Sequence, residues 1–397
     1  MALDLSKVIN QVTSMAAGLK SHRDENLAKL QNAVAILRSQ SNNLEQLSKK
    51  IEASKTTWLL AKPVEPVDRH YKPQPAPAEF TVFATDGSHI DVDRHQPVPY
   101  CLINIGSVLL HYGAHPDAIL DSIPQLYASD EELMLSAPGM KGKEQPLEGT
   151  LLGIKRSVEE CRRLAEITSQ LPIGSKGLGL IDGSLILWDL ETFPDFVNDA
   201  LLQKGLLAYL EQIRKLNEDR EIPIASYISY PRSNDVTNTL RVALCPMKTV
   251  DSDRCAECQT RECDFINGVH DRELFSALLT SGERSAQFIS SSKIQKRYGK
   301  HQVHFFYLKL DEEIARMEIP QWVANDDKLL NLVHTLVLDQ GHRGQGYPVA
   351  LSEAHEKAVI TGSDRENIRQ IVEASLIGEH LPIAGSAKSQ SKRTRWV

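Results

Sequence analysis

Two apolar segments of this chain each run directly into the tripeptide Asp-Gly-Ser. The first is "FTVFATDGS", which ends at Ser88, and the second is "GLGLIDGSLILW", which ends at Trp188. Both have the β-branched, aromatic and large apolar residues of buried strands. Asp-Gly alone is a common turn pair, but an ionised carboxylate beside a buried strand is costly unless it is paired or bound to a metal. The repetition therefore favours a functional site to which Asp86 and Asp182 both contribute.

The order of the remaining elements predicts an α/β domain. A strand in "YCLINIGSVLLHYG" follows the first motif and predicts an antiparallel hairpin. Apolar residues then recur at helical spacing in residues 147–169, 196–217, 271–279 and 326–341, and "SEAHEKAVITG" begins another helix. Strands are expected in "IPIASYISY" and "HQVHFFYLKL". Strands come first along the domain, and strands and helices alternate after them. This order indicates a mixed sheet flanked by helices.

The two ends of the chain differ from this main domain, which we expect to span residues 80–385. Residues 1–60 are expected to be helical, with apolar positions alternating in steps of three and four from Leu27 to Ile51, although Ser41 and Ser48 fall on the same seam. This pattern suits either a short coiled coil that forms a dimer or an amphipathic helix lying on its own domain. Residues 61–79 form a proline-rich linker or arm, and residues 386–397 form a basic, flexible tail.

Composition bounds the class of protein. The 397 residues contain no run of about 18 apolar residues such as a membrane span needs, and the N-terminus lacks the basic and apolar regions of a signal sequence. We therefore expect a soluble cytoplasmic protein. The formal net charge of -7 gives no general attraction to a polyanion, so DNA binding would depend on local basic patches or bound metal ions.

Carboxylates from neighbouring strands can jointly hold divalent cations such as Mg²⁺ or Mn²⁺. Two such ions about 3.5 to 4 Å apart can activate water and stabilise the leaving oxygen in phosphodiester cleavage. The helix that precedes Asp182 is expected to supply a third carboxylate. Helical periodicity places Glu160 on the side that faces the sheet, with Glu159 as the alternative, and either glutamate could instead belong to a solvated face.

Three further polar residues are candidates for the same site. The segment "GYPVALSEAHEKAVIT" places Tyr347 in a turn and His355 in the first turns of the helix that follows. A histidine there can bind a metal or contact a phosphate, although a lone histidine is more often a surface or core residue. Arg232, in "SYPRSND", could hold a phosphate or pair with a carboxylate.

The ordered combination of these motifs resembles the NurA nuclease family over residues 80 to 365 or so. The resemblance implies a ribonuclease H-like core, a ring-shaped homodimer and Mn²⁺- or Mg²⁺-dependent degradation of DNA, both endonucleolytic on single strands and 5′ to 3′ on duplex ends. It also implies a partnership with the hexameric HerA ATPase in DNA end resection and repair. The catalytic residues that it implies are Asp86, Glu160 (or Glu159), Asp182, Arg232, Tyr347 and His355, of which Asp86, Asp182, Glu160 and His355 would bind the catalytic metal.

A cysteine-rich insert at residues 245–263 departs from this family pattern. The segment "LCPMKTVDSDRCAECQTRECDF" contains Cys245, Cys255, Cys258 and Cys263, including one Cys-x-x-Cys pair. In a cytoplasmic protein such a cluster favours a metal site over disulfides. Four thiolates suit structural zinc or an iron–sulfur cluster. The remaining cysteines, Cys101 and Cys161, are expected in the core.

Two other functions compete with a metal-dependent DNA nuclease. A nucleotide-dependent phosphotransferase with a ribonuclease H-like core would also place Asp-Gly turns near phosphates, but the sequence shows no glycine-rich adenosine pocket. A non-catalytic adaptor for DNA ends or for an ATPase would be favoured if Asp86 were dispensable. The paired aspartates and the family resemblance lead us to expect the nuclease.

Overall fold

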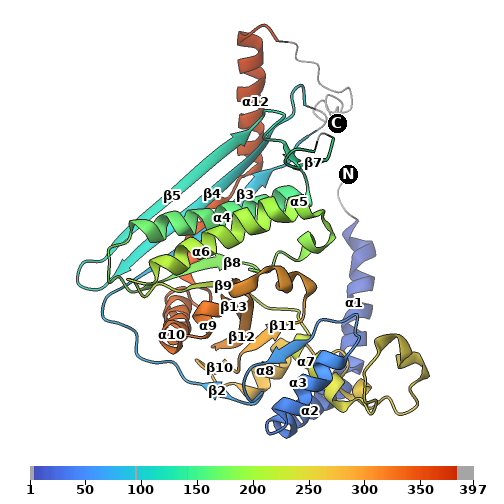
Figure 1. Ribbon diagram of the computed structural model, residues 1–397. Helices are drawn as coiled ribbons and strands as arrows, with labels where there is room; N and C mark the ends of the chain where they lie inside the picture. The colour runs from blue at the N-terminus through green and yellow to red at the C-terminus, as the bar shows by residue number, and fades with distance from the viewer. Residues whose placement is uncertain (1–3, 94–95, 141, 382–397) are drawn as a thin grey trace. The chain divides into compact units, whose positions relative to one another are not determined.

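The computed structural model describes residues 4–93, 96–140 and 142–381, so the predicted basic tail at 386–397 lies outside the described residues. The chain divides into two compact units (Figure 1). The first unit contains Met1–Pro73, Ile228–Ser292 and His304–Met317, and the second contains Gln74–Tyr227, Lys293–Val303 and Glu318–Val397. The N-terminal helices and the cysteine-rich segment thus belong to the same unit.

The second unit is built around a mixed sheet with the strand order β9-β8-β3-β4-β5. The predicted hairpin is present, because β3 and β4 pair antiparallel along their length, and β5 continues this pattern on the outside. The β3–β8 and β8–β9 pairs are parallel. The strands are β3 (Phe80–Ile90), β4 (Cys101–Tyr112), β5 (Asp117–Tyr127), β8 (Gly177–Asp182) and β9 (Ile224–Ile228).

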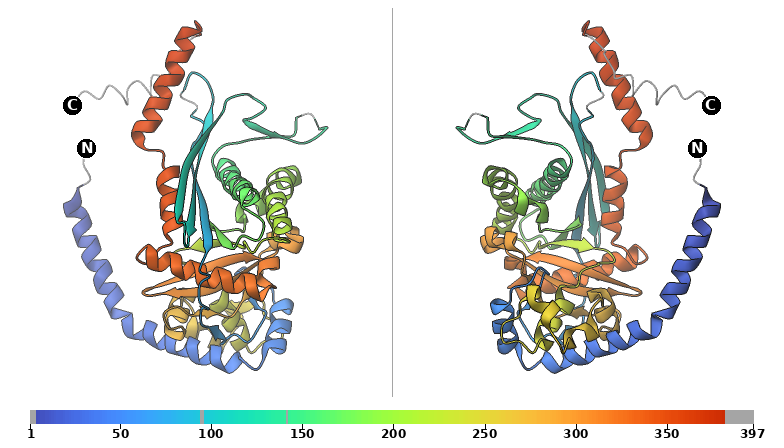
Figure 2. Two further views of the ribbon diagram at one scale, coloured as in Figure 1. Left: turned by 90° about the vertical axis from the view of Figure 1, so that its left-hand side faces the viewer. Right: turned by 90° about the vertical axis from the view of Figure 1, so that its right-hand side faces the viewer.

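Helices cover both faces of this sheet (Figure 2). On one face lies α4 (Thr150–Gln170), whose buried apolar residues include Leu152, Cys161 and Leu164. On the other face lies α11 (Val349–Ala358). This helix packs directly on β4, because a Cβ atom added at Gly106 would lie 2.3 Å from the backbone oxygen of Ala354. The predicted mixed α/β architecture with flanking helices is confirmed.

The remaining elements of the second unit support this framework. The predicted helix at 196–217 is three joined segments: α5 (Asp195–Asn198), a π-helical segment η2 (Asp199–Leu206) and α6 (Leu207–Leu216). Among the described helices, none is long and apolar enough to cross a bilayer. The other elements are β6 (Met134–Ser136), β7 (Glu144–Pro146), η1 (Trp188–Thr192), η5 (Lys293–Arg297), η6 (Gly299–His301), α9 (Gln321–Ala324), α10 (Asp327–Arg343) and α12 (Gly362–Gly378).

The first unit contains short antiparallel strands and several helices. Strand β11 (Phe288–Ser290) pairs with β1 (Ala61–Pro63) and β12 (Val303–Leu310), and β10 (Arg284–Ser285) pairs with β12 and β2 (His70–Tyr71). Strand β13 (Glu313–Pro320) begins in this unit. The helical elements are α1 (Leu5–Ser21), α2 (Arg23–Gln40), α3 (Leu44–Ala53), α7 (Asp235–Leu244), η3 (Ser252–Glu257), η4 (Glu262–Ile266) and α8 (Asp271–Leu278).

The predicted N-terminal seam faces the core of this first unit. Leu37, Leu47 and Ile51 are buried together with Phe275 and Phe288. The helix breaks between Gln40 and Leu44, so the heptad pattern does not continue through one helix. This arrangement matches the alternative in which amphipathic helices lie on their own domain.

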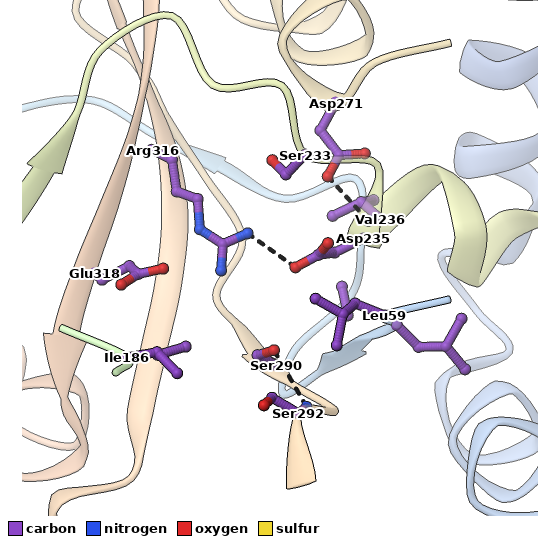
Figure 3. A network of polar contacts seen from close by, with 12 residues as sticks. Leu59, Ile186, Ser233, Asp235, Val236, Asp271, Ser290, Ser292, Arg316 and Glu318 are labelled. Carbon is purple, nitrogen blue, oxygen red and sulfur yellow. Dashed lines mark hydrogen bonds and ion pairs between the residues drawn. The ribbon is translucent and has the colours of Figure 1, made fainter. Parts of the chain in front are cut away.

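A buried polar network fixes the start of α7 in the first unit (Figure 3). Asp235 accepts a hydrogen bond from Arg316 at 3.0 Å, and Asp271 accepts from the backbone N–H of Val236 at 3.1 Å and from the Tyr307 hydroxyl at 2.7 Å. Burial raises the pKa of Asp271, and the charge of Asp235 adds to this rise. Because donors surround both carboxylates, we interpret this network as structural.

Candidate active site

Asp86 and Asp182 occupy matching positions on neighbouring parallel strands. Asp86 lies within β3, Asp182 is the last residue of β8, and the residues just before them, Thr85 and Ile181, are paired in register. Adjacent strands lie about 4.8 Å apart, and matched residues of parallel strands point to the same face. Burial raises the pKa of Asp182, and the negative charge of Asp86 raises it further. The structure thus brings the two predicted aspartates together.

The two Asp-Gly-Ser motifs have different backbone geometry. The first motif lies inside a strand, because β3 continues through it to Ile90. The second motif does end a strand, and Gly183 has a φ of +90°, a left-handed conformation that favours glycine. After that turn, the Ser184 hydroxyl donates to Glu318 Oε2 at 2.7 Å. The shared tripeptide therefore places one aspartate in mid-strand and the other at a turn.

Gly87 lets helix α4 bring Glu160 close to β3. A Cβ atom at position 87 would lie 2.6 Å from Glu160 Oε1 and 2.7 Å from Arg156 Cγ, so a larger residue would displace these side chains. The Glu160 side chain is only 3% exposed, and its Oε1 lies 3.1 Å from Arg156 Nε. Neither of these two atoms has a hydrogen-bond partner, which means that their contact is an ion pair with poor hydrogen-bond geometry.

The electrostatics of Glu160 connect it with the two aspartates. Burial raises the pKa of Glu160 to about 8, and the charges of Asp86 and Asp182 contribute to the rise, while Arg156 opposes it. Negative charges that raise the pKa of a carboxyl group lie near it, in surroundings that water screens poorly. The site therefore carries more carboxylate charge than Arg156 alone can balance.

Glu159, the alternative to Glu160, lies in a different environment. Its carboxylate pairs with Lys155 at 2.6 Å and also with Arg162. Although burial acts in the opposite direction, these two cations hold the pKa of Glu159 below its ordinary value. Of the two glutamates, the structure thus places Glu160 beside the aspartates and Glu159 in a separate ion-pair network.

His355 contacts Asp86 from the opposite face of the sheet. Its Nδ1 lies 2.7 Å from Asp86 Oδ2, and its side chain is 63% exposed. The residue lies in the last turn of α11, so the predicted position in the first turns of the helix is wrong. The end of this helix is held by Ser88, whose hydroxyl donates to the carbonyl oxygen of Ala358, and by Asn104, whose amide donates to the same oxygen at 3.0 Å. The serine of the first motif therefore helps to position His355.

The other two predicted residues, Tyr347 and Arg232, differ in their relation to the site. Tyr347 makes a side-chain hydrogen bond to Asp182, which acts to lower the pKa of that aspartate, and its ring packs edge-on against Tyr227 with centroids 5.4 Å apart. Arg232 is exposed in the loop between β9 and α7 and belongs to the first unit, whereas the carboxylates belong to the second. Its assignment to the site stays a prediction.

The carboxylate oxygens of the site suit a divalent cation, although they are not arranged around a single metal position. Among the described residues, no three His, Cys, Asp or Glu side chains are already placed to hold one ion. Glu160 approaches from α4, whereas Asp86 is engaged by His355 of α11 on the other face. The unsatisfied oxygen of Glu160 and the excess of carboxylate charge still suit a hard cation. Asp86, Asp182 and Glu160 are the residues that could hold it.

Two basic residues on the α4 side of β3, Arg156 and His89, were not predicted from the sequence. Arg156 lies one helical turn before Glu160, and this i, i+4 spacing could have identified it. His89 lies two residues after Gly87, on the same face of the strand. Burial lowers the pKa of His89, and the charge of Arg156 lowers it further. Arg156 therefore adds positive charge beside Glu160, whereas the lowered pKa of His89 favours its neutral form.

Comparison with known proteins adds a family match. The model of the NurA domain matches residues 80–360. The crystal structure of the NurA nuclease from Sulfolobus solfataricus is similar with 13% sequence identity and a TM-score of 0.49, covering 96% of this chain and 98% of that chain. Prototype foamy virus protease-reverse transcriptase has 14% identity and a TM-score of 0.18, covering 38% of this chain and 18% of that chain. No curated protein matches.

Proposed function

Because the chain belongs to the NurA family, as the match over residues 80–360 shows, we propose that it is a metal-dependent DNA nuclease. The observation that carries this proposal is the in-register placement of Asp86 and Asp182 on neighbouring strands, with Glu160 near enough for their charges to raise its pKa. Oxygen donors with excess negative charge suit Mn²⁺ or Mg²⁺. A bound cation would lower the pKa of water and offset the charge of the scissile phosphodiester.

The protein's own residues divide the remaining work. Asp86 and Asp182 would hold the cation from the sheet, and Glu160 would add a ligand from α4. Tyr347 steadies Asp182 through its hydrogen bond. Arg156, which lies 3.1 Å from Glu160, offsets part of the carboxylate charge before a cation binds. Arg232 is proposed to contact a DNA phosphate, for which a guanidinium is well suited.

His355 is proposed to move a proton or to contact the phosphate. When Asp86 is ionised, its Oδ2 accepts from the Nδ1–H of His355, and the neutral ring then keeps its lone pair on Nε2. The high exposure of this side chain leaves Nε2 accessible from solvent. His355 can thus accept a proton at Nε2 when neutral, or donate from Nε2 to a phosphate oxygen when protonated. In the metal-loaded site it is also a candidate ligand.

Family membership supports several wider proposals. They are a ribonuclease H-like core, endonuclease activity on single-stranded DNA and 5′ to 3′ exonuclease activity on duplex ends. They also include a homodimer, a HerA-type hexameric ATPase as partner, and a role in DNA end resection and repair in the cytoplasm. The mixed sheet with helices on both faces is compatible with this core.

The direct test is cleavage of labelled DNA. Purified protein is incubated with 5′-labelled single-stranded and duplex DNA, with Mn²⁺, with Mg²⁺ or with EDTA. The variants are Asp86→Asn and Asp182→Asn, and the control is Asp130→Asn, which changes an exposed aspartate in a turn. We expect cation-dependent cleavage by the wild type and the control, and its loss in both site variants.

Two results would contradict the proposal. The first is undiminished cleavage by the folded Asp86→Asn and Asp182→Asn variants, which would place the chemistry elsewhere. The second is the absence of cleavage by the wild type under all conditions, with and without a HerA-type ATPase. That second result would favour the non-catalytic adaptor.

A further inference from the structure

A second cluster of potential metal ligands lies in the first unit. Its ligands are cysteine thiols, whereas those of the candidate active site are carboxylates. Its four cysteines line one cavity of about 270 Å³, together with Trp58 and Arg241 among others. All four thiols are free and partly exposed. The cysteines come from the ends of several short elements: Cys245 caps the C-terminus of α7, Cys255 lies in η3, Cys258 follows η3, and Cys263 lies in η4.

The segment between these cysteines has almost no core of its own. Of residues 246–265, all of which the structure describes, only Val250 is buried among the apolar residues. The regular structure of the segment is limited to the short 3₁₀ turns η3 and η4. Apolar burial is the main source of stability for a folded segment, so this one needs another source. A metal bound by side chains can provide it.

The start of the segment is firmly attached to the rest of the first unit. Lys50 Nζ donates to the backbone oxygen of Cys245 at 2.5 Å. Lys55 exchanges backbone hydrogen bonds with the segment, donating to Val250 at 2.8 Å and accepting from Ser252 at 2.9 Å. Cys245 is therefore a fixed ligand position toward which the 3₁₀ turns can close.

The turn after Cys258 has an unusual backbone geometry. Arg261 adopts a left-handed conformation with φ of 45° and ψ of 34°, which is uncommon for a residue other than glycine. Beside this turn the Thr260 hydroxyl lies 3.6 Å from the Cys258 sulfur, to which it can donate. Such donors stabilise a thiolate, the form in which cysteine binds a metal. The Cys255–Cys258 pair thus combines the spacing and the sulfur environment of half of a four-cysteine site.

We propose that Cys245, Cys255, Cys258 and Cys263 bind one structural Zn²⁺ ion. Four thiolates satisfy its tetrahedral preference and leave no open position for substrate. Among the described residues the sulfurs are not yet in ligating positions, so binding would draw η3 and η4 toward Cys245. The ion would hold together a segment that lacks a core, independently of the nuclease activity.

Zinc suits this cavity better than an iron–sulfur cluster. The lining includes the charged residues Arg241, Asp251 and Asp264, and the cysteines are partly open to solvent. Zinc has no redox chemistry that such exposure would disturb. An iron–sulfur cluster depends on its burial and surroundings for its redox properties. The soft thiolate ligands of this site prefer different metals from the carboxylate site, whose oxygen ligands suit hard cations.

The metal content of the full-length protein tests the proposal. The protein is purified under reducing conditions without a metal-binding tag, and zinc and iron are measured by elemental analysis. The test variant is Cys258→Ala, and the matched control is Cys101→Ala, which removes a buried thiol of the second unit. We expect about one zinc ion per chain in the wild type and in the control, and a fall to background in the Cys258 variant.

A second measurement applies if Cys258→Ala does not fold. Wild-type protein is then treated with a thiol-modifying reagent, and released zinc is measured with a chromogenic chelator. Metal-depleted wild type is also titrated with Co²⁺, whose absorption reports tetrahedral thiolate ligation. Release of zinc and this cobalt spectrum would support the proposal. Absence of both, iron accompanied by acid-labile sulfide, or equal loss of zinc in the Cys101 variant would overturn it.

Discussion

Replacing Glu160 with glutamine should stabilise the metal-free protein at neutral pH and at the same time abolish cleavage. Burial raises the pKa of Glu160 from an ordinary 4.5 to about 8, with further contributions from Asp86 and Asp182. Because the folded state binds this proton more tightly than the unfolded state, the loss of folding stability caused by burying Glu160 is absent below pH 4.5 or so. It grows as the pH rises and is complete above a pH of about 8. Each pKa unit corresponds to about 1.4 kcal/mol, so at pH 7.5 the raised pKa of Glu160 costs the folded protein roughly 4 kcal/mol, mostly as the free energy of keeping this carboxyl group protonated.

The assay is thermal or chemical denaturation in EDTA across the range from acidic to mildly alkaline pH. The stability difference between Glu160→Gln and the wild type should be small in acid and should increase as the pH rises. Glu159→Gln is the matched control, because Lys155 and Arg162 hold the pKa of Glu159 below its ordinary value. The stability that this lowered pKa provides is present at neutral pH and lost in acid, so the control variant should be less stable than the wild type at neutral pH.

Addition of Mn²⁺ should reverse the order of Glu160→Gln and the wild type. A ligand that binds only the folded state stabilises it in proportion to the logarithm of its concentration over its dissociation constant, and the wild type has the additional carboxylate. A stability difference between Glu160→Gln and the wild type that does not change with pH would refute the electrostatic reasoning. So would a Glu160→Gln variant that is less stable than the wild type at pH 8 without metal.

Four further substitutions test the packing around the site and the polar network of the first unit. Gly87→Ala would place a Cβ atom 2.6 Å from Glu160 Oε1, so denaturation should show a loss of about 1–3 kcal/mol together with slower cleavage. Gly153→Ala, in α4 where nothing lies within 4 Å, should instead add about 1 kcal/mol. Ser88→Ala removes a donor to the end of α11, which should cost about 1 kcal/mol and lower the cleavage rate through His355; an unchanged rate would argue against this positioning role. Asp271→Ala leaves several buried donors unpaired, so it should cost about 3 kcal/mol or more without changing cleavage by the folded fraction.

The pairing of Asp86 with Asp182 could be predicted because a buried strand has a strong local signal. Apolar, β-branched residues identify the strand, and a carboxylate at its edge is conspicuous. Helical periodicity likewise favoured Glu160 over Glu159 without excluding the latter, since one side of α4 packs on the sheet and its apolar residues show which side. In both cases burial leaves a pattern in the sequence, and the structure follows that pattern.

Other features depend on tertiary contacts that leave little local signal. Strand β5 is mostly exposed, so it lacks the apolar alternation that identifies a half-buried strand. The first Asp-Gly-Ser resembles a turn, but β3 runs straight through it because Gly87 makes room for Glu160. The place of His355 in α11 follows from where that helix begins and ends, which depends on packing against β4 and on contacts with Ser88. Helix boundaries set in this way are hard to derive from spacing.

The central claim, that Asp86 and Asp182 hold a catalytic cation, is tested most directly by locating bound manganese. Crystals grown with Mn²⁺ would be measured at a wavelength where manganese scatters anomalously. We expect an anomalous peak between the carboxylates of Asp86 and Asp182, within reach of Glu160, and its disappearance in the Asp86→Asn variant. No peak at these carboxylates in a form of the protein that cleaves DNA with Mn²⁺, or a peak bound only elsewhere, would contradict it.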